Sequence, residues 1–327
     1  MKRHISLAII ASICVLVCLL VLFPFPAQGP SPALGSSVPV SNLPTPTATA
    51  EQTPPPPTPP LPTPAPDAIR ASHAFVYNVS DDAVYYTKGG TAERVAPASL
   101  TKLFTAFVVL ELLDPAQVVT VGEEVTWVDP GSSLAYILPG HKLRVDMLVE
   151  GMLLNSGNDA AYTLAVAGGR KLANNQELSA KGAFRRFMEH MNLRAQGLDL
   201  TGTHFVNPDG IDEEDHYTCI QDLITIARIS LANPTIAKYA GMKSDNVTFA
   251  SGETIQWYNT NYLLHKSTDY YCAEAVGLKT GSTSGAGKCL ISAFRNGPHS
   301  YLIVGVLGCQ SDDVRYSDTL LLYNMYR

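Results

Sequence analysis

The chain lacks a basic patch, an internal repeat and any cysteine pattern typical of a zinc site. Acidic residues outnumber basic ones by 29 to 23, and the formal net charge is −6. A nucleic-acid-binding surface needs clustered Lys and Arg, so the sequence argues against a nucleic-acid partner. The 327 residues are 46% hydrophobic and 16% charged, which is typical of one large globular domain or two small ones.

Cysteine is sparse and divides into two groups. Cys14 and Cys18 lie in an apolar N-terminal run, where they serve as apolar filler. The other four are Cys219, Cys272, Cys289 and Cys309. Their spacings of 53, 17 and 20 residues match no zinc-binding pattern. We therefore predict no metal and no other cofactor. A disulfide is permitted if this part is exported, but its pairing stays open.

The N-terminus has the features of a membrane segment. Lys2 and Arg3 precede an almost unbroken apolar run of 19 residues, 5–23, which is longer than the ~7–15 residues of a signal-peptide core and long enough to span a bilayer. The leading positive charges predict that the N-terminus stays inside and the rest lies outside. We expect residues 1–25 to be an uncleaved anchor, or alternatively a signal segment cleaved near residues 27–29.

A proline-rich tract follows. Residues 24–66 hold 16 of the 23 prolines, without a Gly-X-Y period, so the tract cannot form a core and favours extended polyproline II. We expect residues 26–67 to be a solvated linker that can hold a domain up to ~100 Å from its anchor, at ~3.1 Å per residue. The folded, catalytic domain is then residues 68–327.

The domain has strand patterns at both ends and helical patterns between them. Residues 73–90 predict two strands around a turn at Asp81-Asp82, and a helix should start near Ser99. Residues 143–231 are mostly helical in pattern, and a final helix is expected over 316–325. Three further strands are predicted at 275–281, 288–296 and 300–309. This order indicates an α+β fold, with one antiparallel sheet built from both ends, helices packed on it, and a helical lobe facing it across a cleft.

Three short motifs are more informative in combination than any one of them is alone. In the first, Ser99 and Lys102 lie almost one turn apart at the start of the apolar run LFTAFVVLELL, so the lysine can lie beside the serine. A serine hydroxyl needs a base to become a nucleophile, and a buried lysine with a lowered pKa can be that base. A plain N-cap serine with a solvated lysine is the alternative.

The second and third motifs supply the other walls of a cleft. Lys279-Thr280-Gly281 ends an apolar strand, where the lysine can place positive charge and the glycine lets a substrate backbone approach the strand edge. An ordinary strand-end turn is the alternative. Ser-x-Asn occurs twice, at 156–158 and 244–246. We prefer Ser156 and Asn158, which lie between two helical segments, whereas 244–246 is polar and typical of a loop.

The set SLTK, SGN and KTG resembles the serine-type D-alanyl-D-alanine carboxypeptidases, the low-molecular-weight penicillin-binding proteins. The blocks PASLTKLFTA, GSSLAYILPGHKLRVDMLVEGMLLNSGNDAA, THFVNPDGI, YNTNYLL with Asn259 and Asn261, and GLKTGSTSGAGKCL extend the resemblance over about 72–327. It implies the DD-peptidase/β-lactamase-like fold. It also implies removal of the terminal D-alanine from peptidoglycan stem peptides, and acylation by β-lactam antibiotics.

The resemblance also implies roles for individual residues. Ser99 would be the acylated nucleophile and Lys102 the proton acceptor, while Ser156 relays protons and Asn158 holds the substrate backbone. The strand that binds the peptide would contribute Lys279, Thr280, Gly281, Ser282 and Thr283. The oxyanion hole would be the backbone N–H groups of Ser99 and Ser282. Arg315 would bind the terminal carboxylate, with a surface ion pair as the alternative.

The family's better-known anchored members often carry a further β-rich domain and a C-terminal amphipathic helix, which we do not expect here. The resemblance instead implies a domain on the extracytoplasmic face of the bacterial membrane, held by its N-terminal segment, or secreted if that segment is cleaved. Two other functions stay open, a serine β-lactamase and an exported non-enzymatic sensor of β-lactams or peptidoglycan. A class A β-lactamase needs a Glu-x-x-x-Asn segment, but the first glutamate after Asn158, Glu177, has Lys181 four residues on.

Overall fold

The computed structural model describes residues 61–65, 67–298 and 300–327. The expected anchor, residues 1–25, and most of the expected linker lie outside this part of the chain. Among the described residues, no helix combines the length and apolar character that a membrane crossing requires.

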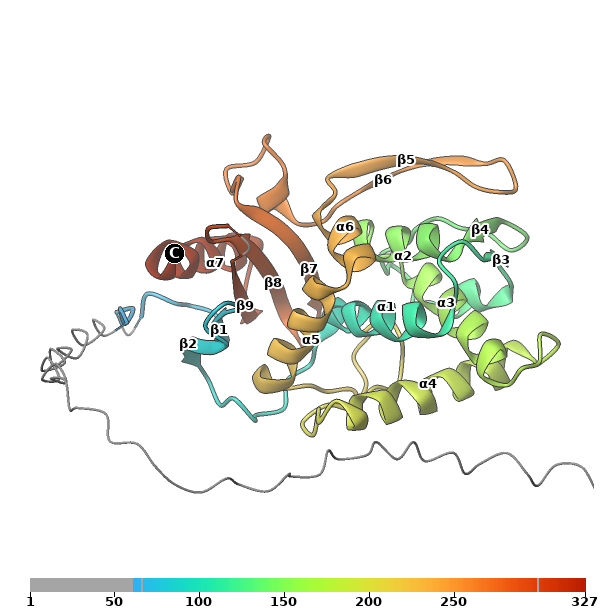
Figure 1. Ribbon diagram of the computed structural model, residues 1–327, viewed down its shortest axis with the longest axis horizontal. Helices are drawn as coiled ribbons and strands as arrows, with labels where there is room; N and C mark the ends of the chain where they lie inside the picture. The colour runs from blue at the N-terminus through green and yellow to red at the C-terminus, as the bar shows by residue number, and fades with distance from the viewer. Residues whose placement is uncertain (1–60, 66, 299) are drawn as a thin grey trace, which may run out of the picture. The chain divides into compact units, whose positions relative to one another are not determined.

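One five-stranded antiparallel sheet organises the fold, in the order β2-β1-β9-β8-β7 (Figure 1). Its strands are β1 (His73–Asn78), β2 (Ala83–Lys88), β7 (Ala275–Thr283), β8 (Gly287–Arg295) and β9 (Tyr301–Cys309). The first strand pairs with the last, from His73 opposite Leu307 to Asn78 opposite Leu302. The prediction of one antiparallel sheet built from both ends of the domain is therefore confirmed.

Alternate residues of the strands face two different cores. Phe75, Ile291 and Ile303 pack into the larger core with the helical lobe. Their neighbours Val76 and Leu290 pack into a second core against α7 (Asp312–Tyr326). Since successive side chains of a strand point to opposite faces, the sheet is covered on both sides, by α7 on one and by the helical lobe on the other (Figure 1).

In the described part of the chain, the helical lobe contains six α-helices. They are α1 (Thr101–Leu112), α2 (Val145–Leu154), α3 (Asn158–Leu172), α4 (Ala180–Gly197), α5 (Ile220–Ala232) and α6 (Pro234–Gly241). Four of them, α2 to α5, account for the helical pattern predicted over 143–231. Short 3-10 turns flank them at η1 (Ala98–Leu100), η2 (Glu123–Trp127) and η3 (Tyr262–Leu264). Two small antiparallel pairs complete the fold, β3 (Val118–Thr120) with β4 (Lys142–Arg144), and β5 (Ser244–Thr248) with β6 (Thr254–Tyr258).

Three local expectations need correction. Ser99 lies inside the 3-10 turn η1 and is not a helix cap, because α1 starts at Thr101 after Leu100. Residues 244–246 are not a loop, since they begin strand β5 and pair with β6. The last helix starts at Asp312, earlier than the apolar pattern indicates, because the Ser311 hydroxyl caps it by accepting a bond from the Val314 N–H.

The four cysteines of the domain are all free thiols, and three of them are buried. Cys289 packs in the larger core and Cys309 in the second, on opposite faces of the sheet. These thiols therefore contribute to the fold as small apolar side chains.

A buried aspartate of α7 fixes the chain where it enters β1. Asp318, only 1% exposed, accepts hydrogen bonds from the backbone N–H groups of Arg70 at 2.6 Å and Ala71 at 2.7 Å. The same helix also carries Asp313, which makes a 3.6 Å ion pair with Arg70 while 64% of its side chain is exposed.

Replacing Asp318 by Ala should therefore lower the free energy of unfolding by about 3 kcal/mol, because the backbone donors lose a charged acceptor. Asp313→Ala is the matched control and should cost less than ~1 kcal/mol, as exposed ion pairs do. Urea unfolding followed by circular dichroism measures both. Equal effects of the two substitutions would contradict this assignment.

Candidate active site

The Ser99 hydroxyl and the Lys102 amine lie in direct contact. Ser99 occupies the turn η1, preceded by Ala98 with φ +49°, and Lys102 lies in the first turn of α1. The Lys102 Nζ is 2.9 Å from the Ser99 Oγ and donates to the backbone oxygen of Asp209 at 2.6 Å. The lysine is completely buried, so the alternative of a solvated lysine beside a capping serine is wrong.

Burial changes the protonation of this lysine. Desolvation lowers the pKa of Lys102 from 10.5 to about 8, against the opposing charges of Asp209 and Asp159. Burial disfavours the charged form of an amine because a low-dielectric interior solvates a charge poorly. Near neutral pH a measurable fraction of Lys102 is therefore unprotonated, and the neutral amine can accept the proton of the serine hydroxyl.

Strand β7 passes directly beside this pair. A methyl group at Gly281 would come within 3.2 Å of the Ser99 backbone nitrogen and 3.0 Å of the Ala98 Cβ. Lys279 is 1% exposed, and its Nζ donates to the Thr280 carbonyl at 3.1 Å. Burial, and then the charges of Lys102 and Arg315, lower the pKa of Lys279 well below its usual range. The Ser99–Lys102 motif and the Lys279-Thr280-Gly281 motif thus meet in space.

Thr280 is held by the polypeptide on the other side of β7. Its Oγ1 lies 2.5 Å from the Thr260 Oγ1. Thr260 is placed by its two neighbours: Asn259 donates to the carbonyls of Ala240 and Met242, and Asn261 donates to Ser292. The asparagine pair of YNTNYLL therefore fixes the segment that carries Thr260, by binding α6 and β8.

Ser156 and Asn158 lie at the junction of α2 and α3, and both are buried. Ser156 has φ +56°, and Asn158 begins α3 with its N–H bonded to the Ser133 carbonyl at 2.9 Å. Gly157 between them has no room for a side chain, because a Cβ would lie 2.7 Å from Ala135. In the described part of the chain, no hydrogen bond joins the side chain of Ser156 or Asn158 to Ser99.

Asp159 shapes the loop that faces this junction. Its carboxylate accepts the N–H groups of Ala135 at 2.7 Å and Ile137 at 3.1 Å. The Trp257 indole of β6 donates to the Ala135 carbonyl at 2.9 Å. The β5–β6 hairpin, which contains the second Ser-x-Asn motif, therefore supports this loop through Trp257. Ser244 and Asn246 are themselves exposed on β5.

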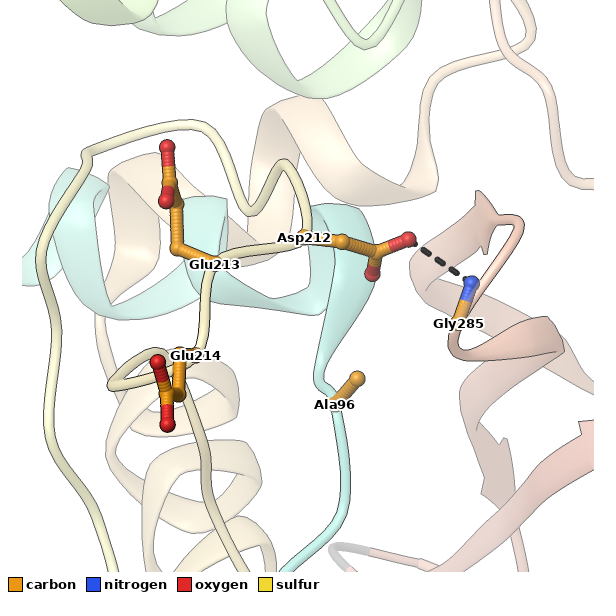
Figure 2. A pocket seen from close by; sticks show the side chains of 5 residues that line it. All are labelled: Ala96, Asp212, Glu213, Glu214 and Gly285. Carbon is orange, nitrogen blue, oxygen red and sulfur yellow. Dashed lines mark hydrogen bonds between the residues drawn. The ribbon is translucent and has the colours of Figure 1, made fainter.

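The end of β7 contacts an acidic loop. Thr283 donates to one oxygen of Asp212 at 2.6 Å, and the other oxygen accepts the Gly285 N–H at 2.7 Å. Asp212 lines a cavity of about 390 Å³ together with Ala96, Glu213, Glu214 and Gly285. Figure 2 shows the Asp212 carboxylate directed at Gly285, with Glu213 and Glu214 pointing elsewhere. Ser282 is exposed, whereas the hydroxyl of Thr283 already donates its hydrogen bond to Asp212.

Arg315 lies under the strand rather than on the surface. It is 6% exposed, and its Nη1 donates to the carbonyls of Gly281 at 3.2 Å and Cys289 at 3.4 Å. It also makes a 2.6 Å ion pair with Asp312, whose side chain is 43% exposed. The ion pair considered from the sequence exists, but the guanidinium itself is buried next to Gly281.

Two residues of the site were missed by sequence reasoning. Asp209 supplies the carbonyl that binds Lys102. His216 contacts the Thr101 hydroxyl at 2.9 Å and accepts the Val206 N–H at 3.2 Å. Burial lowers the pKa of His216 to about 4, so this imidazole is neutral. Asp209 belongs to the block THFVNPDGI and His216 follows it five residues later, so the block was the signal in the sequence that could have indicated them.

The arrangement fits nucleophilic chemistry. Within the described ranges, no group of three His, Cys, Asp or Glu residues is placed to hold a metal ion. A serine, a buried amine with lowered pKa and a strand edge together can form and resolve an acyl-enzyme.

Comparison with known proteins gives a consistent result. Residues 61–311 match the family model described as D-alanyl-D-alanine carboxypeptidase. The chain is 35% identical to D-alanyl-D-alanine carboxypeptidase DacD of Escherichia coli, over 69% of this chain and 55% of that one. It is 32% identical to the D-alanyl-D-alanine carboxypeptidase of Streptomyces sp. strain K15, over 78% of this chain and 87% of that one.

Solved structures agree with the sequence matches. The crystal structure of the Streptomyces K15 DD-transpeptidase superposes with a TM-score of 0.70 at 30% identity, covering 81% of this chain and 98% of that chain. The expected DD-peptidase fold is confirmed. The chain spans about half the length of two curated relatives, 55% of both the E. coli DacD and the Bacillus subtilis DacF.

The lowered pKa of Lys102 predicts how acylation depends on pH. The rate of Ser99 modification by an activated ester should rise with pH and level off above a midpoint near 8, because only the neutral amine accepts the proton. Mass spectrometry of the full chain measures the rate, with Lys102→Met as the control that should lose the dependence. A midpoint near 10.5 would contradict a role for a buried, neutral Lys102.

The contact between β7 and η1 predicts a specific glycine effect. Gly281→Ala should slow acylation by on the order of tenfold to a hundredfold, because the new methyl group shifts the backbone of Ser99 relative to β7. Gly197→Ala, at the end of α4 with only the end of Arg194 nearby, is the control and should leave the rate unchanged. If both variants acylate alike, the close approach of β7 is not needed.

Proposed function

The chain belongs to the D-alanyl-D-alanine carboxypeptidase family, and we propose from this premise that it removes the terminal D-alanine from peptidoglycan stem peptides. The observation that supports the proposal most strongly is the 2.9 Å contact between the Ser99 hydroxyl and a fully buried Lys102. Neutral Lys102 takes the hydroxyl proton while Ser99 Oγ attacks the carbonyl between the two terminal D-alanines. D-alanine leaves, and water then hydrolyses the ester on Ser99.

The other predicted residues have consistent places in this proposal. The backbone N–H groups of Ser99 and Ser282 would stabilise the oxyanion, since preorganised donors act best where negative charge develops. Ser156 would relay the proton to the leaving amine, and Asn158 would hold the peptide backbone. Lys279, Thr280 and Gly281 would border the bound peptide. Thr283 would act indirectly, by fixing the loop of Asp212, because its hydroxyl already donates a hydrogen bond to that carboxylate.

Arg315 would bind the terminal carboxylate of the substrate. Its Nε has no hydrogen-bond partner in the described part of the chain, and its position next to Gly281 supports an approach from the end of β7. A buried guanidinium favours a carboxylate partner because the charged hydrogen bonds are strong in a low dielectric. In this proposal the exposed carboxylate of Asp312 competes with the substrate for the guanidinium.

A second outcome of the same acyl-enzyme is transpeptidation. The matched Streptomyces K15 structure is named a DD-transpeptidase, whereas the curated relative from the same Streptomyces strain is named a carboxypeptidase. Both reactions share acylation and differ only in whether water or an amine attacks the ester. A serine β-lactamase is less well supported, because Glu177 is exposed in the loop between α3 and α4.

The proposal includes partners and location. A β-lactam carries a reactive amide in place of the D-alanyl-D-alanine bond, and so would acylate Ser99 and leave slowly. We further propose that residues 1–25 hold the domain at the extracytoplasmic face of the bacterial membrane through the linker 26–67. Secretion after cleavage of that segment is the alternative.

Assay of free D-alanine tests the function. The full chain should release D-alanine from diacetyl-Lys-D-Ala-D-Ala and form a covalent adduct with a labelled penicillin. Ser99→Ala should abolish both, because the attacking oxygen is gone, and Ser156→Ala should reduce release on the order of a hundredfold or more, the usual scale of proton-transfer catalysis.

Ser244→Ala is the matched control, since Ser244 is the exposed serine of the other Ser-x-Asn motif and should leave release unchanged. An adduct without D-alanine release would contradict a carboxypeptidase and favour a sensor or transpeptidase. Rapid steady hydrolysis of the penicillin would favour a β-lactamase.

A further inference from the structure

A second cavity, of about 270 Å³, shares Glu213 with the cavity at the end of β7. Three aromatic side chains and three acidic ones line it, from η2, α3, α4 and the loop that follows α4. We call it the aromatic–acidic cavity, and its lining includes Trp127, Tyr162, Phe184, Asp129, Asp209 and Glu213.

Asp209 gives this cavity a buried carboxyl oxygen without a hydrogen-bond partner. The residue is 1% exposed, and among the described residues its Oδ2 has no hydrogen-bond partner. Its other oxygen accepts only a long bond, 3.4 Å, from the Ile211 N–H. The Lys102 amine does not bond this carboxylate, since it binds the Asp209 carbonyl and the Ser99 hydroxyl. Burial raises the pKa of this carboxyl, and the charge of Lys102 opposes the rise, because a buried carboxylate without a partner is costly. A cationic group entering the cavity would pair with the carboxylate and relieve that cost.

The rest of the lining favours an organic cation. Trp127 packs edge-on against Tyr162 and Phe184, with ring centroids 6.0 and 5.9 Å apart, and aromatic faces attract ammonium groups. Burial raises the pKa of the Tyr162 hydroxyl, and the charges of Asp209, Asp129 and Glu213 raise it further, so this hydroxyl lies near all three carboxylates. No metal-holding cluster of three His, Cys, Asp or Glu occurs in the described ranges.

The cavity shares one residue with the reaction centre. The backbone carbonyl of Asp209, whose side chain lines the cavity, accepts a hydrogen bond from Lys102, and Lys102 contacts the Ser99 hydroxyl. In a stem peptide, a diamino acid precedes the two D-alanines, and its side-chain amine is a free ammonium before cross-linking and a neutral amide afterwards. A lysine-type ammonium sits on a flexible four-carbon stem, so it can leave a peptide bound along β7 and reach a neighbouring cavity.

We propose that the aromatic–acidic cavity binds the free side-chain ammonium of the residue before D-alanyl-D-alanine, so that the enzyme selects stem peptides that are not yet cross-linked at that amine. This inference rests on the proposed function. The carboxylates of Asp209 and Glu213 attract the ammonium, and the rings of Trp127 and Tyr162 cover its methylene stem. An acylated side chain loses the charge and leaves Asp209 unpaired.

Equilibrium binding to the full chain carrying Ser99→Ala tests the inference without turnover. The two ligands are Nα-acetyl-Lys-D-Ala-D-Ala, with a free ammonium, and its Nα,Nε-diacetyl form. Tryptophan fluorescence is a suitable signal, because Trp127 lines the cavity and the other tryptophan, Trp257, is fully buried elsewhere. The free-amine peptide should bind about tenfold more tightly, as expected for one charge-assisted interaction.

Asp209→Asn should abolish this preference and Glu213→Gln should reduce it. Glu214→Gln should preserve it, because Glu214 lines the first cavity but not the second. Equal affinity for the two peptides, absence of binding by both, or a preference unchanged in Asp209→Asn would overturn the inference. Failure of the proposed function is a separate result, since it is the absence of D-alanine release by the chain with Ser99 intact.

Discussion

The burial of one lysine amine against one serine hydroxyl is the constraint on which the rest of the site depends. Lys102 has no exposed surface, and within the described residues its hydrogen bonds go to Ser99 Oγ and the Asp209 carbonyl. Because desolvation penalises the ammonium form, the same burial that holds the side chain still also prepares it to accept a proton. A solvent-exposed lysine at the same spacing would be charged and mobile, and could do neither.

That burial is produced by segments far apart in the sequence. The loop with Asp209 covers the amine from one side. On the other, β7 approaches so closely at Gly281 that a Cβ there would lie 3.0 Å from the Ala98 Cβ. β7 is in turn held by the Thr260–Thr280 contact and by Arg315 from α7. The pairing of β1 with β9 joins the N-terminal strands to the C-terminal strands in one sheet. Both ends of the domain therefore contribute to the position of one serine. The charges that act on Lys102 also come from distant segments, since Asp159 of α3 and Asp209 of the loop after α4 both oppose the lowering of its pKa.

Much of this could be predicted from local patterns, and the exceptions have physical reasons. The period-2 strands, the helical middle and the motifs around Ser99, Ser156 and Lys279 are local signals, and the fold that they imply is confirmed. The start of α7 depended on a single hydrogen bond from the Val314 N–H to Ser311, which an apolar pattern does not record. Asp209 and His216 act through contacts more than 100 residues away in sequence. The sequence of β5 is mostly polar, so it resembles a loop. Its pairing with β6 and the burial of Trp257 become visible only in the structure.

The most direct test is the titration of the Lys102 amine itself by NMR, with the lysine side chains labelled and Lys102 assigned from the spectrum of Lys102→Arg. The Lys102 resonance should titrate near pH 8, separate from exposed lysines near 10.5. It should move toward that ordinary value when denaturant unfolds the protein. A Lys102 resonance that titrates near 10.5 in the folded protein would mean that the amine stays charged at neutral pH, and the account of Ser99 activation by a neutral lysine would be wrong.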